Sequence, residues 1–282
     1  MTKILTIACS TLGNRLSDAI DVYHSLQADA EKIDFLIIHQ IPHGDELSEK
    51  NKQIQQWLIN ESKIKYVPSY TKGLTKSRNI GIKNCNTKYI WIMDDDITFE
   101  ANIISMVQNR LIASESNEKS ACHTFESVKP SGAKRTRYPA DGEALNSKQL
   151  LRVASFEMIL NKDELLSNGV CFREDMGVGG NNINLGEESV LIADIRDTGG
   201  VTLHHSLVVL THPEISTGVI VDEKNFYSKG VVIKRCFNGF EKLFFYVRDV
   251  NRLLKNKKNE FGAIYYRFKL IAALTKGCFG NE

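Results

Sequence analysis

The chain has 282 residues, which suits one large α/β domain with an appended helical piece, the arrangement that we favour over two domains. Lys and Arg number 36 against 34 Asp and Glu, and a net charge of +2 lacks the basic excess of a nucleic-acid-binding protein, so we expect no nucleic-acid partner. The six cysteines are scattered without a C-x-x-C pair, which indicates reduced thiols of a cytoplasmic protein rather than a disulfide or zinc framework.

The amino-terminal part alternates between strand and helix patterns. The expected elements are a strand over 3–9, a turn over 10–14, a helix over 15–27, a strand over 33–39, a helix over 46–60 and a strand over 64–67. The apolar stretch 4–9 is too short for an export signal. Such alternation predicts a mostly parallel sheet, in which ligands bind outside the carboxyl ends of the strands. Ser10 and Thr11 fall at that edge.

Three consecutive carboxylates, Asp94, Asp95 and Asp96, follow an apolar strand over 88–93. Carboxylates so close together are costly to desolvate, so they should lie at the carboxyl end of the strand and face water or a cation. Oxygen ligands favour Mg²⁺ or Mn²⁺. A solvated acidic loop, or the start of a helix near Glu100, explains the same residues without a metal.

The segment 73–83, just before that strand, is expected to be a helix that carries Lys76 and Arg78 in its first turns. Arg78 could pair with an Asp of the triplet as a structural contact or could contact a ligand directly, and the two roles can coexist.

A helix over 102–112 and a strand over 121–125 precede a stretch without hydrophobic periodicity, 126–146. So long an irregular loop is often a mobile lid or an acceptor-binding segment. Its residues Lys134, Arg135 and Arg137 could meet an anionic acceptor, although a solvated loop would carry the same charges.

A strand over 156–160 and a helix over 162–167 lead to a glycine-rich loop. Gly177, Gly179 and Gly180 do not form a dinucleotide fingerprint, and we expect them to give flexibility near a substrate. Glu187 and Glu188 precede a helix over 189–197, where acids stabilise the positive end of the helix dipole. One of the two is also a candidate general base.

The stretch 201–210 is expected to be a strand in which His204 and His205 alternate, so at most one of them should face the site. His212 lies beyond the end of that strand and is the better candidate for a metal ligand, with a structural histidine as the alternative.

The carboxyl-terminal part has apolar residues at helical spacing over 240–254 and 261–271, with many Lys and Arg around them. Such helices could pack on the main domain, form an oligomer contact or lie against anionic lipid. No uncharged apolar run reaches the roughly 18 residues of a membrane span.

Four separated motifs occur together in an order that resembles family 2 glycosyltransferases of the GT-A fold. They are Gly73 with Ser77-Arg78-Asn79-Ile80-Gly81, the Asp94-Asp95-Asp96 triplet, the glycine-rich loop into Gly186-Glu187-Glu188, and Thr211-His212-Pro213-Glu214 with Ser216-Thr217-Gly218. The resemblance covers roughly residues 3–220. It implies a GT-A domain over 1–220, with a Rossmann-like, mostly parallel sheet flanked by helices, and a helical region over 221–282 that packs on it or on a membrane surface.

The resemblance also implies roles for particular residues. Asp94 and Asp96 would occupy the ends of the family's D-x-D motif, with Asp96 on a Mn²⁺ or Mg²⁺ ion bound to the donor diphosphate and His212 as a further ligand. Glu188 would be the base. Because this family usually has Glu-Asp where this chain has Glu187-Glu188, Glu187 is the alternative. The residues expected around the donor nucleotide and sugar are Ser10, Thr11, Arg15, Arg78, Asp94 and Asp95.

The function that follows is inverting, metal-dependent transfer of a sugar, as in a hexosyltransferase. The expected donor is a UDP-linked nucleoside-diphosphate sugar, and the expected acceptor is a saccharide or glycolipid in surface polysaccharide synthesis. The expected location is cytoplasmic, with peripheral contact at the inner face of the cell membrane through the basic helices. The alternatives are a nucleotidyltransferase, whose glycine-rich, lysine-bearing signature is missing over 10–15, and a non-catalytic sugar-binding protein of the same fold.

Overall fold

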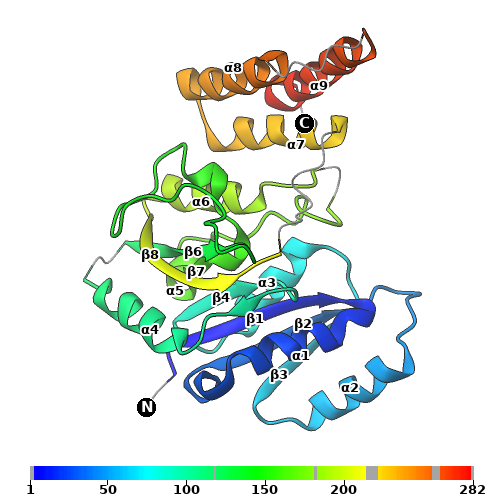
Figure 1. The fold of residues 1–282 in the computed structure, drawn as a ribbon, viewed down its shortest axis with the longest axis vertical. Coiled ribbons are helices and arrows are strands. Elements are labelled where there is room, and N and C mark those ends of the chain that lie inside the picture. Colours follow the sequence, from blue (N-terminus) through cyan, green and yellow to red (C-terminus); the bar gives the residue numbers. More distant parts are fainter. Residues whose placement is uncertain (1–2, 117–118, 181–182, 214–221, 256–260, 281–282) are drawn as a thin grey trace.

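The computed structural model describes residues 3–116, 119–180, 183–213, 222–255 and 261–280. Its centre is an eight-stranded sheet with the strand order β3-β2-β1-β4-β7-β6-β8-β5 (Figure 1). The strands are β1 (Leu5–Leu12), β2 (Asp34–Gln40), β3 (Ile64–Ser69), β4 (Tyr89–Met93), β5 (Thr98–Phe99), β6 (Ser120–Val128), β7 (Met158–Asn161) and β8 (Val201–Thr211).

The two halves of the sheet differ in strand direction. β3, β2, β1 and β4 are all parallel, as the alternating sequence pattern predicts. In the other half β7 runs antiparallel to both β4 and β6, β6 and β8 are parallel, and β5 is antiparallel to β8. The sheet is therefore mixed, and only its amino-terminal half is a purely parallel Rossmann-like unit.

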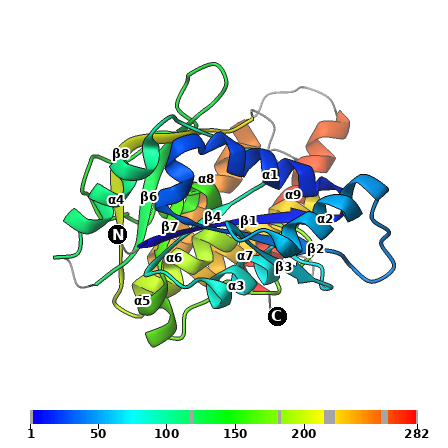
Figure 2. The same cartoon turned by 90° about the horizontal axis from the view of Figure 1, so that it is seen from below.

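Helices cover both faces of the sheet (Figures 1 and 2). One face packs against α1 and α4, and the other against α3, α6 and the carboxyl-terminal helices. Side chains alternate along β1 to serve both cores, because Ile7 and Cys9 face the first and Ala8 the second. The helices of this part are α1 (Leu16–Ser25), α2 (Glu49–Asn60), α3 (Leu74–Asn84), α4 (Ile103–Ala113), α5 (Lys162–Ser167) and α6 (Glu187–Asp197).

Several boundaries differ from the sequence prediction. α2 begins at Glu49 rather than at residue 46, because the Ser48 side chain accepts a hydrogen bond from the Asn51 amide and caps the helix there. α6 begins at Glu187, so both glutamates lie in its first turn. The strand expected over 156–160 is a 3₁₀ turn, Ser155–Glu157, followed by β7.

The segment 126–146 is not the free basic loop that its sequence indicates. Its first residues, 126–128, belong to β6. Arg135 Nε donates to Glu157 Oε1 at 2.8 Å, and Lys134 Nζ lies 2.6 Å from Glu126 Oε2. Both carboxylates are buried. These two cations therefore anchor the loop to the domain, because a buried carboxylate needs a partner; Arg137 is exposed.

Three helices follow β8, namely α7 (Glu223–Cys236), α8 (Gly239–Lys255) and α9 (Phe261–Phe279). The patterns over 240–254 and 261–271 predicted α8 and α9. α7 falls within the helical region expected over 221–282, but no separate helix was predicted for it, because its first half is polar and its second half begins with Gly230. Side chains of all three join the same hydrophobic core as α3 and α6. The 220/221 boundary and the motif residues 214–218 lie outside the described residues. Among the helices that are described, none is long and apolar enough to span a membrane.

Two glycines allow α7 and α9 to touch backbone to backbone. A Cβ atom added at Gly230 would lie 2.3 Å from the Leu274 carbonyl oxygen, and one at Gly277 would lie 2.1 Å from the Tyr227 carbonyl oxygen. Neither backbone atom can move away without moving a helix. The crossing therefore requires glycine at both positions.

We predict that Gly230→Ala and Gly277→Ala each lower the free energy of unfolding by about 1–3 kcal/mol, because overpacking forces the two helices apart. Chemical denaturation followed by circular dichroism measures this loss. Lys276→Ala, an exposed change on the same helix, is the control and should unfold like the wild type. Wild-type stability in both glycine variants would contradict the close crossing.

Candidate active site

The acidic triplet lies beside the end of β1, as the parallel pattern predicts. β1 and β4 are parallel with Cys9 opposite Met93, so Ser10 and Thr11 come level with the residues that follow β4. Thr11 Oγ1 donates to Asp95 Oδ2 at 2.6 Å. Ser10 contacts Ser77 of α3, whose hydroxyl donates to the Ser10 hydroxyl at 2.6 Å. Two strand ends and one helix therefore converge here.

The middle carboxylate of the triplet points into the protein. Asp95 is buried and lies 2.7 Å from Arg15 Nη2, in addition to its contact with Thr11. Burial raises the pKa of Asp95 to about 6, against the opposing effects of Thr11 and Arg15. Thr11 and Arg15 thus bind the carboxylate of Asp95 in this structure. Asp94 and Asp96 are the two acids of the triplet that face outward.

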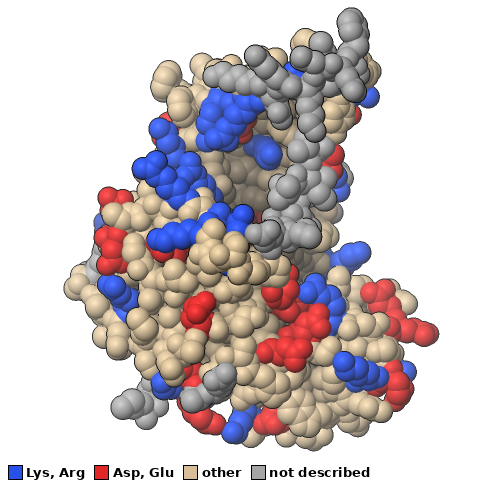
Figure 3. Space-filling model, in the orientation of Figure 1, with Lys and Arg blue, Asp and Glu red and all other residues tan. Residues whose placement is uncertain are grey.

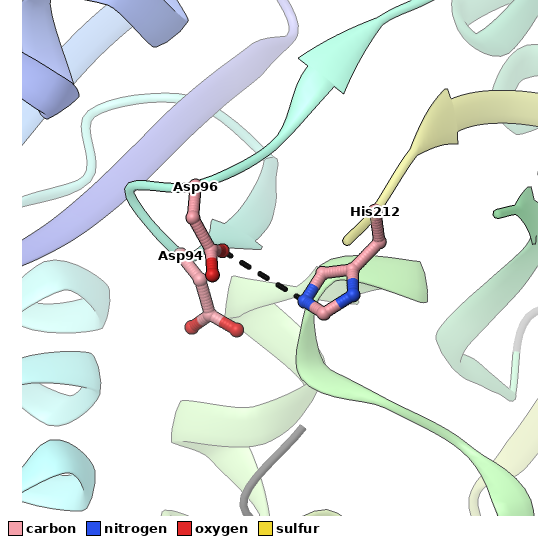
Figure 4. A group of neighbouring side chains, drawn as sticks. All are labelled: Asp94, Asp96 and His212. Atoms are coloured by element: carbon pink, nitrogen blue, oxygen red, sulfur yellow. Dashed lines mark ion pairs between the residues drawn. The ribbon is translucent and has the colours of Figure 1, made fainter. Parts of the chain in front are cut away.

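Asp94 and Asp96 meet His212 from the end of β8 (Figure 4). One ligand atom of each lies within 4.8 Å of the others, and His212 Nε2 is 3.7 Å from Asp96 Oδ1. His212 Nδ1 is 2.7 Å from the Pro213 carbonyl oxygen, which can only accept, so Nδ1 carries the proton and Nε2 is the free lone pair. Two carboxylates and one imidazole nitrogen fit a divalent cation such as Mn²⁺.

The sequence analysis missed two side chains that orient this group. The Phe156 ring stacks on His212 with ring centroids 4.3 Å apart, and the Ser155 hydroxyl is 3.4 Å from Asp94 Oδ2. Both belong to the 3₁₀ turn Ser155–Glu157, of which only residues 156 and 157 lay in the strand expected over 156–160, and no local signal marks them.

A single buried guanidinium joins the triplet to the two glutamates. Arg78 Nη1 donates to Glu187 Oε1 at 3.0 Å and lies 3.2 Å from Glu188 Oε1, while its Nη2 is 3.6 Å from Asp94 Oδ1. Arg78 is only 2% exposed and comes from α3, the helix predicted to carry it. Its pairing with the triplet is the structural contact that the sequence analysis considered.

Burial distinguishes the two glutamates. Glu187 lies behind Arg78 and is 5% exposed, whereas Glu188 is more open and lines a cavity of about 540 Å³ between α6, α7 and α8. Desolvation and the neighbouring charge of Glu187 raise the pKa of Glu188 to about 7, although Arg78 opposes this. Glu188, at the cavity wall, therefore has a pKa that suits proton exchange near neutrality.

The glycine-rich loop is hydrogen-bonded to the start of α3 at its described residues. The Leu74 amide donates to the Val178 carbonyl at 2.9 Å, and Thr75 Oγ1 donates to the Met176 carbonyl at 3.0 Å. A Cβ at Gly177 would lie 3.3 Å from the Glu187 carboxylate, and Gly177 has φ +80°. The glycine is needed because the backbone passes close to Glu187 in a left-handed conformation.

His204 and His205 lie away from the site. Both are buried in β8, where His205 Nε2 is 3.0 Å from His123 Nδ1 and His204 stacks on Tyr138. The expectation that at most one would face the site is met because neither does.

We predict that Glu188→Gln stabilises the protein increasingly as the pH rises from about 5 to about 8. The raised pKa of Glu188 means that the folded state keeps its proton to higher pH than the unfolded state, so its stabilising contribution is lost as the pH rises through about 7. Glutamine cannot ionise, and the gain at pH 8 should exceed about 1 kcal/mol. Denaturant titrations at both pH values measure it.

The matched control is Glu223→Gln, which changes an exposed carboxylate on α7 and should show no such pH dependence. A constant difference between Glu188→Gln and the wild type across this range would mean that Glu188 titrates normally.

Comparison with known proteins agrees with this architecture. The model of "Glycosyl transferase family 2" matches residues 14–166, just over half of the chain, while no curated protein sequence matches. The crystal structure of residues 1–349 of TarS from S. aureus is similar with a TM-score of 0.62 and 13% identity, covering 98% of this chain and 81% of that chain. The crystal structure of the same TarS fragment in complex with UDP-GlcNAc is similar with a TM-score of 0.64 and 12% identity. It also covers 98% of this chain and 81% of that chain. The chain therefore has the GT-A fold and belongs to glycosyltransferase family 2.

Proposed function

We propose that this protein is an inverting, metal-dependent hexosyltransferase that uses a UDP-linked sugar and a saccharide or glycolipid acceptor in surface polysaccharide synthesis. The observation that carries the proposal is the bridge of Arg78 between Asp94, one of the two outward-facing acids of the triplet, and Glu188. It holds a cation-binding group and a candidate base in one site. That the related TarS was crystallised with UDP-GlcNAc supports a uridine nucleotide for this chain.

The donor side is assigned to the triplet and its neighbours. Asp94, Asp96 and His212 would hold the divalent cation, which when bound supplies positive charge for the departing diphosphate. Asp95 keeps Thr11 and Arg15 in place at the end of β1. Carboxyl groups outnumber guanidinium groups around the triplet, which favours a cation there.

The acceptor side is assigned to Glu188. A hydroxyl in the cavity could give its proton to this carboxylate as it attacks the anomeric carbon from the side opposite the diphosphate. Attack from the opposite side inverts the anomeric configuration. Arg78 would keep Glu188 ionised enough to accept a proton, and Glu187, which is more buried, would hold Arg78.

We predict that Asp96→Asn abolishes metal-dependent donor binding, because the variant loses a charged ligand, whereas Glu188→Gln binds the donor normally and loses transfer. Calorimetric titration with UDP sugars and Mn²⁺, together with an assay of UDP release, separates the two effects. Transfer in Glu188→Gln should fall by a factor of about 10² or more, which is the usual range for a lost general base.

Asp163→Asn, a change in an exposed carboxylate of α5, is the control for both measurements. Absence of donor binding by the wild type with metal present would contradict the proposal, and full activity of Glu188→Gln would move the base to Glu187.

We further propose that the protein works in the cytoplasm and touches the inner face of the membrane through α8. Phe240 is 81% exposed, and Leu243, Phe244 and Val247 on the same helix face are also exposed. Cations lie beside them, since Lys148 Nζ is 5.5 Å from the Phe244 ring centroid. An apolar helix face flanked by cations is typical of attachment to anionic lipid.

We predict that the double variant Phe240→Ser/Phe244→Ser loses most of its binding to vesicles containing phosphatidylglycerol, because about 0.8 kcal/mol is lost per apolar CH₂ group removed from lipid. Co-sedimentation measures the bound fraction. Ile59→Ser, an exposed position on α2, is the control and should bind as the wild type does. Equal binding by the double variant would rule out α8 as the contact.

A further inference from the structure

The cavity lined by Glu188 extends from α6 to the carboxyl-terminal helices. α7 contributes Phe226, Lys229 and Val232 to its wall, and α8 contributes Arg248, Asp249 and Arg252. In Figure 3 Lys and Arg side chains gather along the left side of the hollow between the upper helices and the domain below. The wall thus combines apolar surface with a group of cations, although the overall charge of the chain is close to neutral.

The cations of this wall are only partly neutralised. Arg248 Nε lies 2.8 Å from Asp249 Oδ1, and Arg252 Nη1 lies 3.7 Å from the same oxygen. Lys229 has no carboxylate within ion-pair distance among the described residues, and its ammonium lies over the Phe226 ring at 4.4 Å from the centroid. The cavity lining therefore carries three cations against two carboxylates, Asp249 and Glu188, and neither carboxylate forms an ion pair with Lys229.

This arrangement is unfavourable for Lys229 in the free protein. Burial lowers the pKa of Lys229, and the nearby charges of Arg252 and Arg248 lower it further, against the opposing charge of Asp249. An anion bound in the cavity would replace lost hydration and offset the repulsion among the cations. The wall is therefore complementary to a negatively charged group.

The same cavity also holds the carboxylate that is assigned to proton transfer. A ligand lying along it would reach Glu188 at the α6 wall and Lys229 at the α7 wall. Contacts with both residues would fix the position and the orientation of the ligand, which lowers the entropic barrier to reaction. Apolar side chains such as Phe226 and Val232 would pack against the sugar faces.

We propose that this cavity binds the acceptor, and that the acceptor is an anionic saccharide whose phosphate or carboxylate group contacts Lys229 while its hydroxyl faces Glu188. This inference rests on the proposed function, because it takes Glu188 as the base. It adds the chemical class of the acceptor and the residue that selects it.

The experiment measures binding of three probes to the full chain: glucose, glucose 6-phosphate and glucuronate. It is carried out in Asp96→Asn, so that the donor site cannot take up the sugar phosphate through a cation. We expect at least one anionic probe to bind about tenfold more tightly than glucose, since a charge-assisted contact is worth about 1.5–3 kcal/mol. Calorimetry at low and high salt measures the dissociation constants.

Three further variants test Lys229 itself in the same background. Lys229→Met keeps the apolar stem that packs near Phe226 and should remove the preference for anions, whereas Lys229→Arg should retain it. Lys224→Gln, an exposed change on the same helix outside the cavity wall, should behave as the parent does. Circular dichroism confirms that each variant is folded.

The outcomes separate this inference from the proposed function. A preference for an anionic probe that requires Lys229 supports the inference whether or not donor turnover is seen. Equal binding of glucose and both anionic probes, or an unchanged preference in Lys229→Met, overturns it even if the protein transfers sugar. Lys229-dependent binding only to phosphatidylglycerol vesicles also overturns it, because the cation would then serve the membrane.

Discussion

The whole site depends on the placement of one guanidinium in the protein interior. Arg78 is almost fully buried, yet its two terminal nitrogens reach Glu187, Glu188 and Asp94, which come from the start of α6 and the end of β4. A buried charge is tolerated only when paired, and closely spaced carboxylates repel unless a cation lies between them. The buried guanidinium and the carboxylates therefore stabilise one another. Because they come from α3, α6 and β4, these three elements must pack together for the charges to be paired.

Much of the site follows from sequence because strand direction controls it. The pattern of apolar runs predicts that Thr11 and Asp95 fall at the same edge of the sheet, and the parallel pairing of β1 with β4 brings them into contact. The pattern could not predict the mixed half of the sheet or the anchoring of Arg135 by Glu157, since both depend on contacts between distant segments. Nor could it give the bounds of α7 inside the expected helical region, because the apolar residues of α7 pack against side chains of α6 and α9 that are distant in sequence.

Glu187 and Glu188 show how packing distinguishes identical residues. They are adjacent in the first turn of one helix, so propensity and helix dipole treat them alike. A turn of about 100° per residue nonetheless directs one toward Gly177 and the interior and the other toward the cavity. The family pattern makes both glutamates candidates for the base, and the surrounding backbone gives the two side chains different environments.

The contact of α7 with α9 at Gly230 and Gly277 restricts which sequence changes the carboxyl-terminal helices can tolerate. Where side chains fill a helix interface, single substitutions can adjust the spacing in small steps. Here peptide groups meet directly, whereas Gly186 meets the side chain of Val232 across the junction of α6 and α7. The spacing of α7 and α9 is therefore a fixed dimension, so sequence change near the cavity is easier at the side chains of its wall than at this helix crossing.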